Sequence, residues 1–261
     1  MAAVSLARAC GDLARARILH DLTLDVTDGA FVAVVGPSGS GKTTLLRTIA
    51  GLVDVSDGAI RFDGVDVDQL EPGRRDIGMV FQDSALLSHR NVRRNVAFPL
   101  EERRQTAEML RERETAEVRS LRIEHLLERE PHQLSRGEQQ LVQIARTMVR
   151  KPRVLLLDEP FAPLDPHLRA RMRAEISLLQ RGYGVTTVMS TSAPDDAVAL
   201  ADEVVVLDGS PASVVQTGTP VEVHDDPVSL EAATAMGPLL LVTATGGAEG
   251  GGYWLDRPGA L

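Results

Sequence analysis

The chain has 261 residues, of which 43% are hydrophobic and 25% are charged, and its formal net charge is −9. This length favours one large domain, or one domain with a small appendage, and the apolar content is sufficient for a full hydrophobic core. The acidic balance argues against nucleic acid as a partner, no apolar run reaches the ~18 residues that cross a bilayer, and the single cysteine, Cys10, excludes an internal disulfide.

The N-terminal part of the sequence is typical of strands that lead into a glycine-rich loop. Residues 22–26 alternate between apolar and polar side chains, and a Thr-Asp-Gly turn precedes the apolar run 31–35. Residues 36–44 read GPSGSGKTT, and an apolar helical pattern follows at 45–50. Strand, glycine loop and helix are the context in which a G-x-x-x-x-G-K-T motif forms a phosphate-binding loop.

This loop supplies the first candidate site residues. Its glycines allow backbone N–H groups to point at phosphate oxygens. We expect Lys42 to reach the β- and γ-phosphates and the Thr43 hydroxyl to bind Mg²⁺. The expected nucleotide-binding residues of the loop are Gly36, Ser38, Gly39, Gly41, Lys42, Thr43 and Thr44.

The sequence beyond the loop divides into a helical stretch and an alternating α/β pattern. Charged and apolar residues interleave at helical spacing across 91–130, where only Pro99 interrupts, so a helical insertion is expected. The other expected elements are strands at 58–63, 77–81, 153–157, 185–190, 203–207 and 212–216, helices at 166–181, 195–201 and about 228–235, and a terminal hairpin of 239–243 with 253–255. Alternating strands and helices predict an α/β fold with a largely parallel sheet.

Two carboxylates follow the apolar run that begins at residue 154. Ligands gather at the carboxyl ends of parallel strands, so Asp158 and Glu159 are expected beside the phosphate loop. Asp158 suits Mg²⁺, directly or through water, and Glu159 suits orienting or deprotonating the water that attacks the γ-phosphate. The alternative is that both acids cap the helix that follows.

A helix start with two possible uses lies at residues 134–140, LSRGEQQ. Ser135 with Glu138 three residues later forms a capping box, which accounts for the pattern structurally. A helix N-terminus with a serine hydroxyl and Gly137 is also an anion site, and both interpretations can hold together.

Together these motifs resemble the nucleotide-binding subunits of ATP-binding cassette (ABC) transporters. The phosphate loop is similar to the family's Walker A motif, residues 154–159 to Walker B, and residues 134–139 to the signature motif. Gln82 is similar to the Q-loop glutamine, and Asp165 to the D-loop aspartate. The resemblance implies a P-loop NTPase cassette over residues 1–225, with an N-terminal antiparallel β part, a mixed or parallel core sheet and a helical subdomain at about 88–150. Residues 226–261 would then be a remnant of a regulatory domain.

The resemblance also implies cofactors and partners. ATP and Mg²⁺ would be bound, with Thr43, Gln82 and Asp158 at the metal and Glu159 and Gln82 in catalysis. Two cassettes would pair head to tail, so that Ser135 and Gly137 serve the nucleotide of a second ABC subunit, of the same or a different chain. The assembly would lie at the cytoplasmic face of the cell membrane, joined to transmembrane permease subunits and, through them, to an extracytoplasmic solute-binding protein.

Two positions depart from the family pattern. Ser192 stands where the switch histidine is expected, and a serine is too short to contact the γ-phosphate in the same way. Cys10 stands where an aromatic residue usually stacks on adenine. These departures predict a site that binds nucleotide but hydrolyses it slowly, and the competing hypothesis is that Glu159 alone sustains adequate turnover in a homodimer.

The cassette resembles importer subunits for sugars, polyamines, ferric iron or sulfate, with carbohydrate favoured, and residues 85–100 are also similar to methionine and lipid transporter subunits. Two alternatives remain: a soluble ABC ATPase of translation or DNA repair, and a structural ABC subunit that holds ATP without hydrolysing it.

Overall fold

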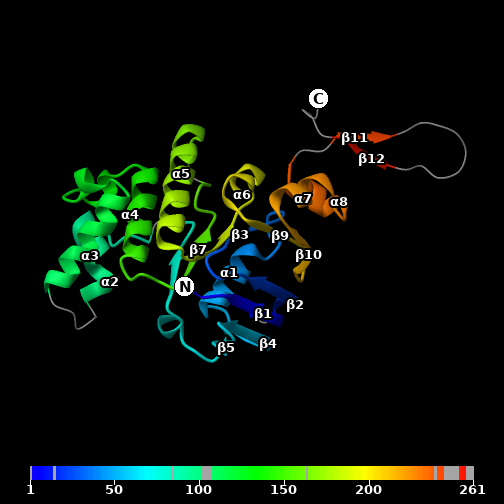
Figure 1. The fold of residues 1–261 in the computed structure, drawn as a ribbon, viewed down its shortest axis with the longest axis horizontal. Helices are drawn as coiled ribbons and strands as arrows, with labels where there is room; N and C mark the ends of the chain where they lie inside the picture. The colour runs from blue at the N-terminus through cyan, green and yellow to red at the C-terminus, as the bar shows by residue number, and fades with distance from the viewer. Residues whose placement is uncertain are drawn as a thin grey trace, which may run out of the picture.

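The computed structural model describes residues 2–13, 16–83, 85–101, 107–162, 164–237, 240–243 and 253–256. Its centre is a six-stranded sheet in the order β10-β9-β3-β8-β7-β6 (Figure 1). The strands of this sheet are β3 (Phe31–Val35), β6 (Ile77–Val80), β7 (Val154–Asp158), β8 (Thr186–Ser190), β9 (Glu203–Asp208) and β10 (Ser213–Gly218). All neighbouring strands run parallel except β10, which pairs antiparallel with β9.

A second, antiparallel sheet in the order β2-β1-β4-β5 contains the N-terminal strands. Its strands are β1 (Val4–Leu13), β2 (Ala16–Val26), β4 (Val55–Phe62) and β5 (Val65–Asp66). The predicted α/β fold with a mixed core sheet and an N-terminal antiparallel part is therefore confirmed.

The helices are α1 (Lys42–Ala50), α2 (Val92–Glu101), α3 (Ala107–Ser120), α4 (Arg136–Met148), α5 (Pro166–Tyr183), α6 (Pro194–Leu200), α7 (Pro220–Asp225) and α8 (Leu230–Ala235), with 3-10 turns at Pro72–Arg74, Glu124–Leu126 and Pro131–Gln133. In Figure 1, α2, α3 and α4 lie at one end of the molecule, α7 and α8 lie toward the opposite end, α5 and α6 lie between these two groups, and α1 lies within the two-sheet part. The predicted helical stretch 91–130 contains α2 and α3, with Pro99 inside α2, and α4 follows at the helix start predicted at residues 134–140.

Alternate side chains of β3 enter two different cores. Phe31, Ala33 and Val35 pack with the helical side of the molecule, whereas Val32 and Val34 pack with α1 and the antiparallel sheet. A strand buried on both faces reads as a continuous apolar run, which is why β3 and β7 are apolar throughout until Asp158. The central sheet is therefore packed on both faces, and this packing holds the strand ends in place.

The C-terminal part contains one helix that the sequence analysis missed. α7 begins with a capping box, because Thr219 accepts a hydrogen bond from the Glu222 N–H and the Glu222 carboxylate accepts one from the Thr219 N–H. β11 (Leu240–Thr243) and β12 (Tyr253–Asp256) pair antiparallel, as the predicted hairpin requires, and the glycine-rich turn between them lies outside the described residues.

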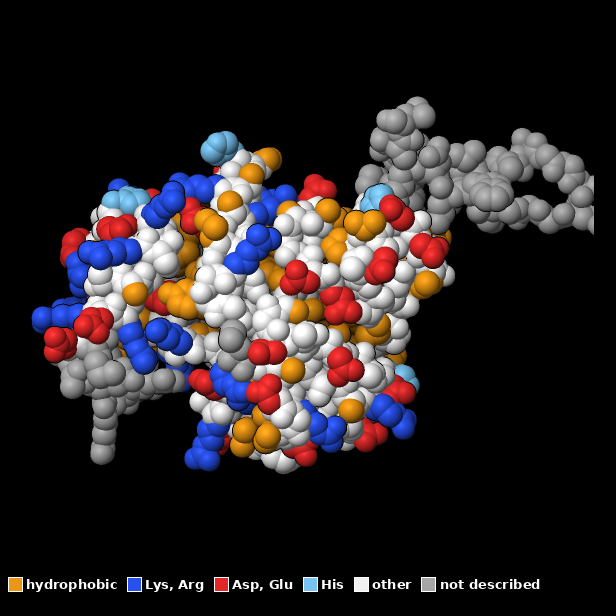
Figure 2. Space-filling model, in the orientation of Figure 1, with side chains coloured by type: hydrophobic (Ala, Val, Ile, Leu, Met, Phe, Trp, Pro, Cys, Tyr) orange, Lys and Arg blue, Asp and Glu red, His pale blue; other side chains and the backbone are white. Residues whose placement is uncertain are grey.

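The visible surface carries both charge signs, with Lys and Arg interspersed among Asp and Glu (Figure 2). Among the helices described, none combines the length and the apolar character that crossing a bilayer requires.

Candidate functional site

The carboxyl ends of three adjacent strands of the central sheet meet at one edge. Ser190 at the end of β8 is in register with Val34 of β3 on one side and with Asp158 of β7 on the other. The glycine loop after β3 and the acids at the end of β7 are therefore neighbours in space although more than a hundred residues separate them in sequence. Parallel sheets bind their ligands at this edge.

The glycine loop has a backbone that only glycine tolerates at its two ends. Gly36 has a φ of +149°, and a Cβ there would lie 2.2 Å from the Leu207 carbonyl oxygen. Gly41, just before α1, has a φ of +84°. No side chain caps the N-terminus of α1, so the first N–H groups of that helix remain available to an anion.

Lys42, the first residue of α1, is held over the loop. Its Nζ donates hydrogen bonds to the carbonyl oxygens of Gly36 and Pro37, each at 2.8 Å, and the residue is only 7% exposed. Burial lowers the pKa of Lys42, and the nearby carboxylates of Glu159 and Asp158 oppose that effect. An ammonium fixed in this way can bind phosphate oxygens that enter the loop.

Thr43 and Asp158 form the part of the site that suits Mg²⁺. The Thr43 Oγ1 donates to Asp158 Oδ1 at 2.8 Å, and Asp158 is buried. The described residues hold no group of three His, Cys, Asp or Glu side chains that would bind a metal by themselves. Mg²⁺ commonly binds one or two carboxylates together with substrate phosphates, so one hydroxyl and one carboxylate beside a phosphate loop fit it.

A cleft of about 430 Å³ lies over the loop and gathers most of the predicted residues. The predicted residues that line it are Ser38, Gly39, Gly41, Lys42, Thr43, Thr44, Gln82, Glu159 and Ser192. Ile18 and Ala162 line it as well, and the sequence analysis singled out neither. Gln82, far from the loop in sequence, thus reaches the same cleft as Lys42.

Glu159 is held by two serines at the end of β8. Its backbone is left-handed, with a φ of +47°, which is uncommon for a residue with a side chain. Its N–H is bonded to Ser190, and its Oε2 accepts a hydrogen bond from Ser192 Oγ at 3.3 Å. The carboxylate therefore lies at the cleft, where a general base would be needed.

Three predicted residues lie at the starts of other helices and do not line this cleft. Ser135 is the N-cap of α4, where its Oγ and N–H both bond to the Glu138 carboxylate at 2.8 Å, so the predicted capping box is present. Gly137 is buried in the first turn of α4, and Asp165 caps α5 by accepting from the N–H groups of residues 167 and 168. These three residues therefore do not contribute to the cleft of their own chain.

The structure does not bring Cys10 to the cleft, contrary to the expectation from the sequence. Cys10 lies in β1 and is 4% exposed, and its Sγ accepts the Asp21 N–H at 3.4 Å. Ile18 of β2 lines the cleft instead. An apolar side chain from the antiparallel sheet, rather than the thiol, therefore faces the space beside the loop.

The ion pair between Asp196 and Arg173, which lies beside the site, was not predicted from the sequence. Asp196 of α6 is 1% exposed, and its Oδ1 accepts from Arg173 Nε of α5 at 2.6 Å. Its other oxygen accepts from Thr191 Oγ1 at 3.2 Å. This contact joins α5, whose N-cap is Asp165, to α6, which follows Ser192.

Comparison with known proteins identifies the family. Residues 19–162 match the model of the family described as ABC transporter. The chain is 45% identical over 221 residues to the sn-glycerol-3-phosphate import ATP-binding protein UgpC of Psychromonas ingrahamii, with 84% of this chain and 58% of that protein covered. It is 44% identical over 219 residues to the trehalose import ATP-binding protein SugC of Mycobacterium tuberculosis, with 84% of this chain and 55% of that protein covered.

Both relatives are therefore considerably longer than the segment that this chain matches. The fold is also similar to that of the ATP-binding cassette MJ0796, solved as a dimer in a post-hydrolysis state bound to ADP and Pi, with a TM-score of 0.73, 27% identity, and 83% of this chain and 98% of that chain covered. Because the family match spans more than half of the sequence and includes both the glycine loop and the acid pair, the chain belongs to the ABC transporter family.

Proposed function

We propose that this chain is the ATP-hydrolysing subunit of an ABC importer. The observation that carries the proposal is the convergence of Lys42, Thr43 and Glu159 on one cleft at an uncapped helix N-terminus, where Thr43 is bonded to the buried Asp158 carboxylate. The N–H groups of the loop and the Lys42 ammonium would bind the nucleotide phosphates. Thr43, Asp158 and Gln82 would hold Mg²⁺, which supplies charge neutralisation on the phosphates when bound.

Glu159 is the proposed general base. Its carboxylate lies in the cleft, and its hydrogen bond from Ser192 directs one oxygen while the other remains available to a water molecule. A carboxylate in this position can orient the attacking water and accept its proton. Loss of this group would remove the acceptor and leave the phosphate-binding loop intact.

A second subunit completes the proposed site. Ser135 and Gly137 form a helix start that does not line the cleft of its own chain, and a head-to-tail dimer would bring that helix start to the nucleotide of the partner. The similarity to a cassette solved as a dimer supports this arrangement. The second subunit can be a copy of this chain or a different ABC ATPase.

We propose that permease subunits bind a groove next to β6 and α4. This groove, of about 390 Å³, combines apolar side chains such as Leu87 and Phe98 with the arginines Arg146 and Arg150. Such a mixture suits an amphipathic segment of a membrane protein. A chain bound in this way would act at the cytoplasmic face of the membrane.

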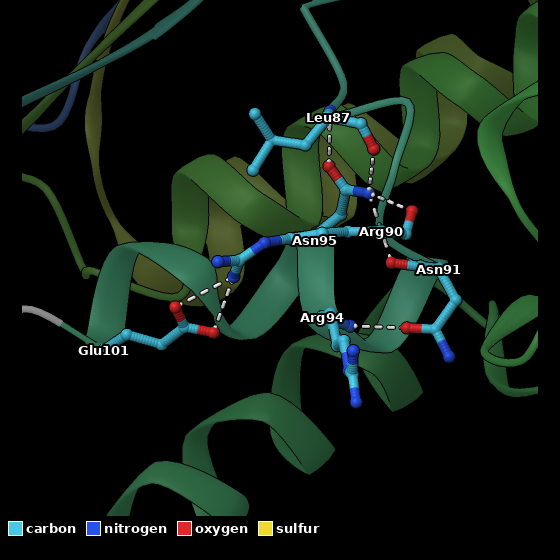
Figure 3. Close-up of polar contacts among 6 residues, drawn as sticks. All are labelled: Leu87, Arg90, Asn91, Arg94, Asn95 and Glu101. Carbon is cyan, nitrogen blue, oxygen red and sulfur yellow. Dashed lines mark hydrogen bonds and ion pairs between the residues drawn. The ribbon is translucent and has the colours of Figure 1, made fainter.

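The wall of the groove is fixed by the buried side chain of Asn95 (Figure 3). Its Oδ1 accepts from the Leu87 N–H at 2.8 Å, and its Nδ2 donates to the carbonyl oxygens of Leu87, Arg90 and Asn91. Arg90 in turn forms two hydrogen bonds to Glu101, at 2.7 and 2.8 Å. Because this loop follows Gln82 directly, a partner in the groove would contact the segment that leads to the nucleotide cleft.

The transported solute is proposed from the relatives alone. The names of the two relatives specify sn-glycerol-3-phosphate import and trehalose import. A carbohydrate or a related polyol phosphate, delivered by an extracytoplasmic solute-binding protein, is therefore the solute class that we favour.

Glu159→Gln tests the proposed function, because glutamine keeps the shape and removes the base. In the chain purified with its permease, we expect kcat for ATP to fall by about 10²–10³ while ATP binding is retained, the usual size of such a loss. Equal turnover in the variant, or no hydrolysis by the wild type, would refute an ATP-hydrolysing subunit.

We also propose that hydrolysis by this chain is slow because a serine stands at position 192. Ser192→His places a longer, protonatable side chain beside Glu159, and we expect it to raise kcat about tenfold or more. A kcat that stays level or falls would favour the alternative in which Glu159 alone sustains turnover.

A further inference from the structure

Ser190 lies at the centre of the sheet edge where β3, β8 and β7 end, although no sequence motif includes it. It is the last residue of β8, the strand between β3 and β7, and its side chain is fully buried. Its register partner on β7 is Asp158. The Ser190 hydroxyl therefore lies within hydrogen-bond distance of both the Asp158 carboxylate, which is proposed to bind the metal, and the Glu159 N–H.

The Ser190 hydroxyl acts both as a hydrogen-bond donor and as an acceptor toward Asp158 and Glu159. Its O–H donates to Asp158 Oδ1 at 2.7 Å, and its oxygen accepts the Glu159 N–H at 3.1 Å. The same Oδ1 also accepts from Thr43 Oγ1 at 2.8 Å, so two hydroxyls, one from α1 and one from β8, fix one carboxylate oxygen. Hydrogen bonds to a charged acceptor in a buried site are stronger than neutral ones, so they restrict how the carboxylate can rotate.

The second contact matters because the Glu159 backbone is held in a left-handed conformation. A non-glycine residue is strained in that conformation and remains there only where neighbouring groups hold it. Ser190 holds the backbone of Glu159 with both its carbonyl oxygen and its hydroxyl oxygen, each 3.1 Å from the Glu159 nitrogen, and Ser192 holds its carboxylate. Two serines, two positions apart, therefore control the direction in which Glu159 points.

We propose that Ser190 is a positioning residue of the hydrolytic centre, whose hydroxyl sets both the Asp158 carboxylate for the metal and the Glu159 backbone for the attack of water. The inference rests on the proposed function, because it assigns Ser190 a role in the reaction of that site. The alternative is that the hydroxyl only satisfies buried polar groups, which would affect stability and leave the reaction unchanged.

The test compares Ser190→Ala with Ser190→Thr in the full chain. Alanine removes the hydroxyl, whereas threonine retains it. Thr187→Val is the matched control, because Thr187 is buried in the same strand and its hydroxyl donates to the Val185 carbonyl, which Gln180 also bonds. The measurements are kcat and KM for ATP, and the Mg²⁺ concentration needed for half-maximal binding of a fluorescent, non-hydrolysable ATP analogue.

We expect Ser190→Ala to lower kcat about tenfold with KM changed less than about twofold, and to raise the required Mg²⁺ concentration about fivefold or more, as groups that orient metal ligands usually do. Binding of the analogue without Mg²⁺ should not change. Ser190→Thr should recover most of both losses, and Thr187→Val should behave like the wild type.

An unchanged Mg²⁺ requirement in Ser190→Ala, or equal losses in Thr187→Val, would overturn the inference. A wild-type chain that binds the analogue but does not hydrolyse ATP would refute the proposed function only, since the Mg²⁺ measurement still decides the role of Ser190. A wild-type chain that binds no nucleotide would overturn both.

Discussion

The N-termini of α1 and α4 are both predicted to bind phosphate, and the structure prepares them differently. α1 has no capping side chain, and its first residue is Lys42. α4 is closed by the reciprocal hydrogen bonds of Ser135 and Glu138. An open helix N-terminus offers its N–H groups to a ligand, whereas a capped one has already used part of them.

The charge at the two helix starts differs as well. The α1 start has an ammonium over the loop, while the α4 start has a carboxylate. Burial of Glu138 opposes ionisation, but hydrogen bonds from Ser135 and the nearby Arg129 outweigh it and lower the pKa of Glu138. The α1 start is therefore prepared to bind an anion by itself, whereas an anion at the α4 start would need N–H groups or positive charge from another surface as well.

The largest expected effect is at α1. Lys42→Ala removes the only lysine near the cleft, and we expect kcat/KM for ATP to fall by about 10²–10³ because a charge that contacts the transferred phosphate is lost. Steady-state ATP hydrolysis measures it. Lys151→Ala, at the other lysine of the chain, is the control, since Lys151 is exposed and lies outside the cleft. Similar losses in both variants would contradict the role of the α1 start.

A smaller effect is expected on the free energy of unfolding, to which the serine at the α4 start should contribute more than the serine near the α1 start. Ser135→Ala removes the cap of α4 and should lower the free energy of unfolding by about 1 kcal/mol. Ser38→Ala, in the exposed loop before the uncapped α1, should change it by less than about 0.5 kcal/mol. Urea unfolding of the two variants measures the difference. Equal losses would mean that α1 depends on a cap at Ser38 that the structure does not contain.

The smallest effect is a loss of stability in acid at the α4 start, which has a carboxylate in its cap, whereas the first turn of α1 has none. Because the pKa of Glu138 is below its ordinary value of 4.5 in the folded chain, its stabilisation is present above pH 4.5 and is lost as pH falls through the folded pKa. Glu138→Gln keeps a capping-box side chain without this titration. Unfolding of both proteins between pH 7 and pH 3 should therefore give curves that converge toward acid, and parallel curves would contradict the prediction.

The features that the sequence predicted are those set by neighbouring residues. The strand, loop and helix around Lys42, the acids at the end of β7 and the capping box of α4 all follow from local spacing. The α7 helix carried the same kind of signal, Thr219 with Glu222, and could have been found from it. Local patterns are readable because the hydrogen bonds that they predict span three or four residues.

The features that the sequence did not predict depend on strand register. β1 contains irregularities between Leu6 and Ala9, between Ala9 and Gly11 and after Gly11, so counting along it does not tell which face Cys10 occupies. The contact between Ser190 and Asp158 arises from pairing of two strands that are separated by α5. Neither pairing leaves a mark in the sequence near the residues concerned.

The buried contact between Asp196 and Arg173 has a mechanical consequence. It joins α5, whose N-cap is Asp165, to α6, which begins two residues after Ser192, through a buried carboxylate and an arginine side chain that is 22% exposed, so solvent screens the pair only weakly. We therefore expect α5 and α6 to move together as one unit. A displacement of α5 at its Asp165 end would then move Ser192 and the Glu159 oxygen that Ser192 holds. A second subunit bound at Asp165 would therefore change the geometry of the cleft without lining it.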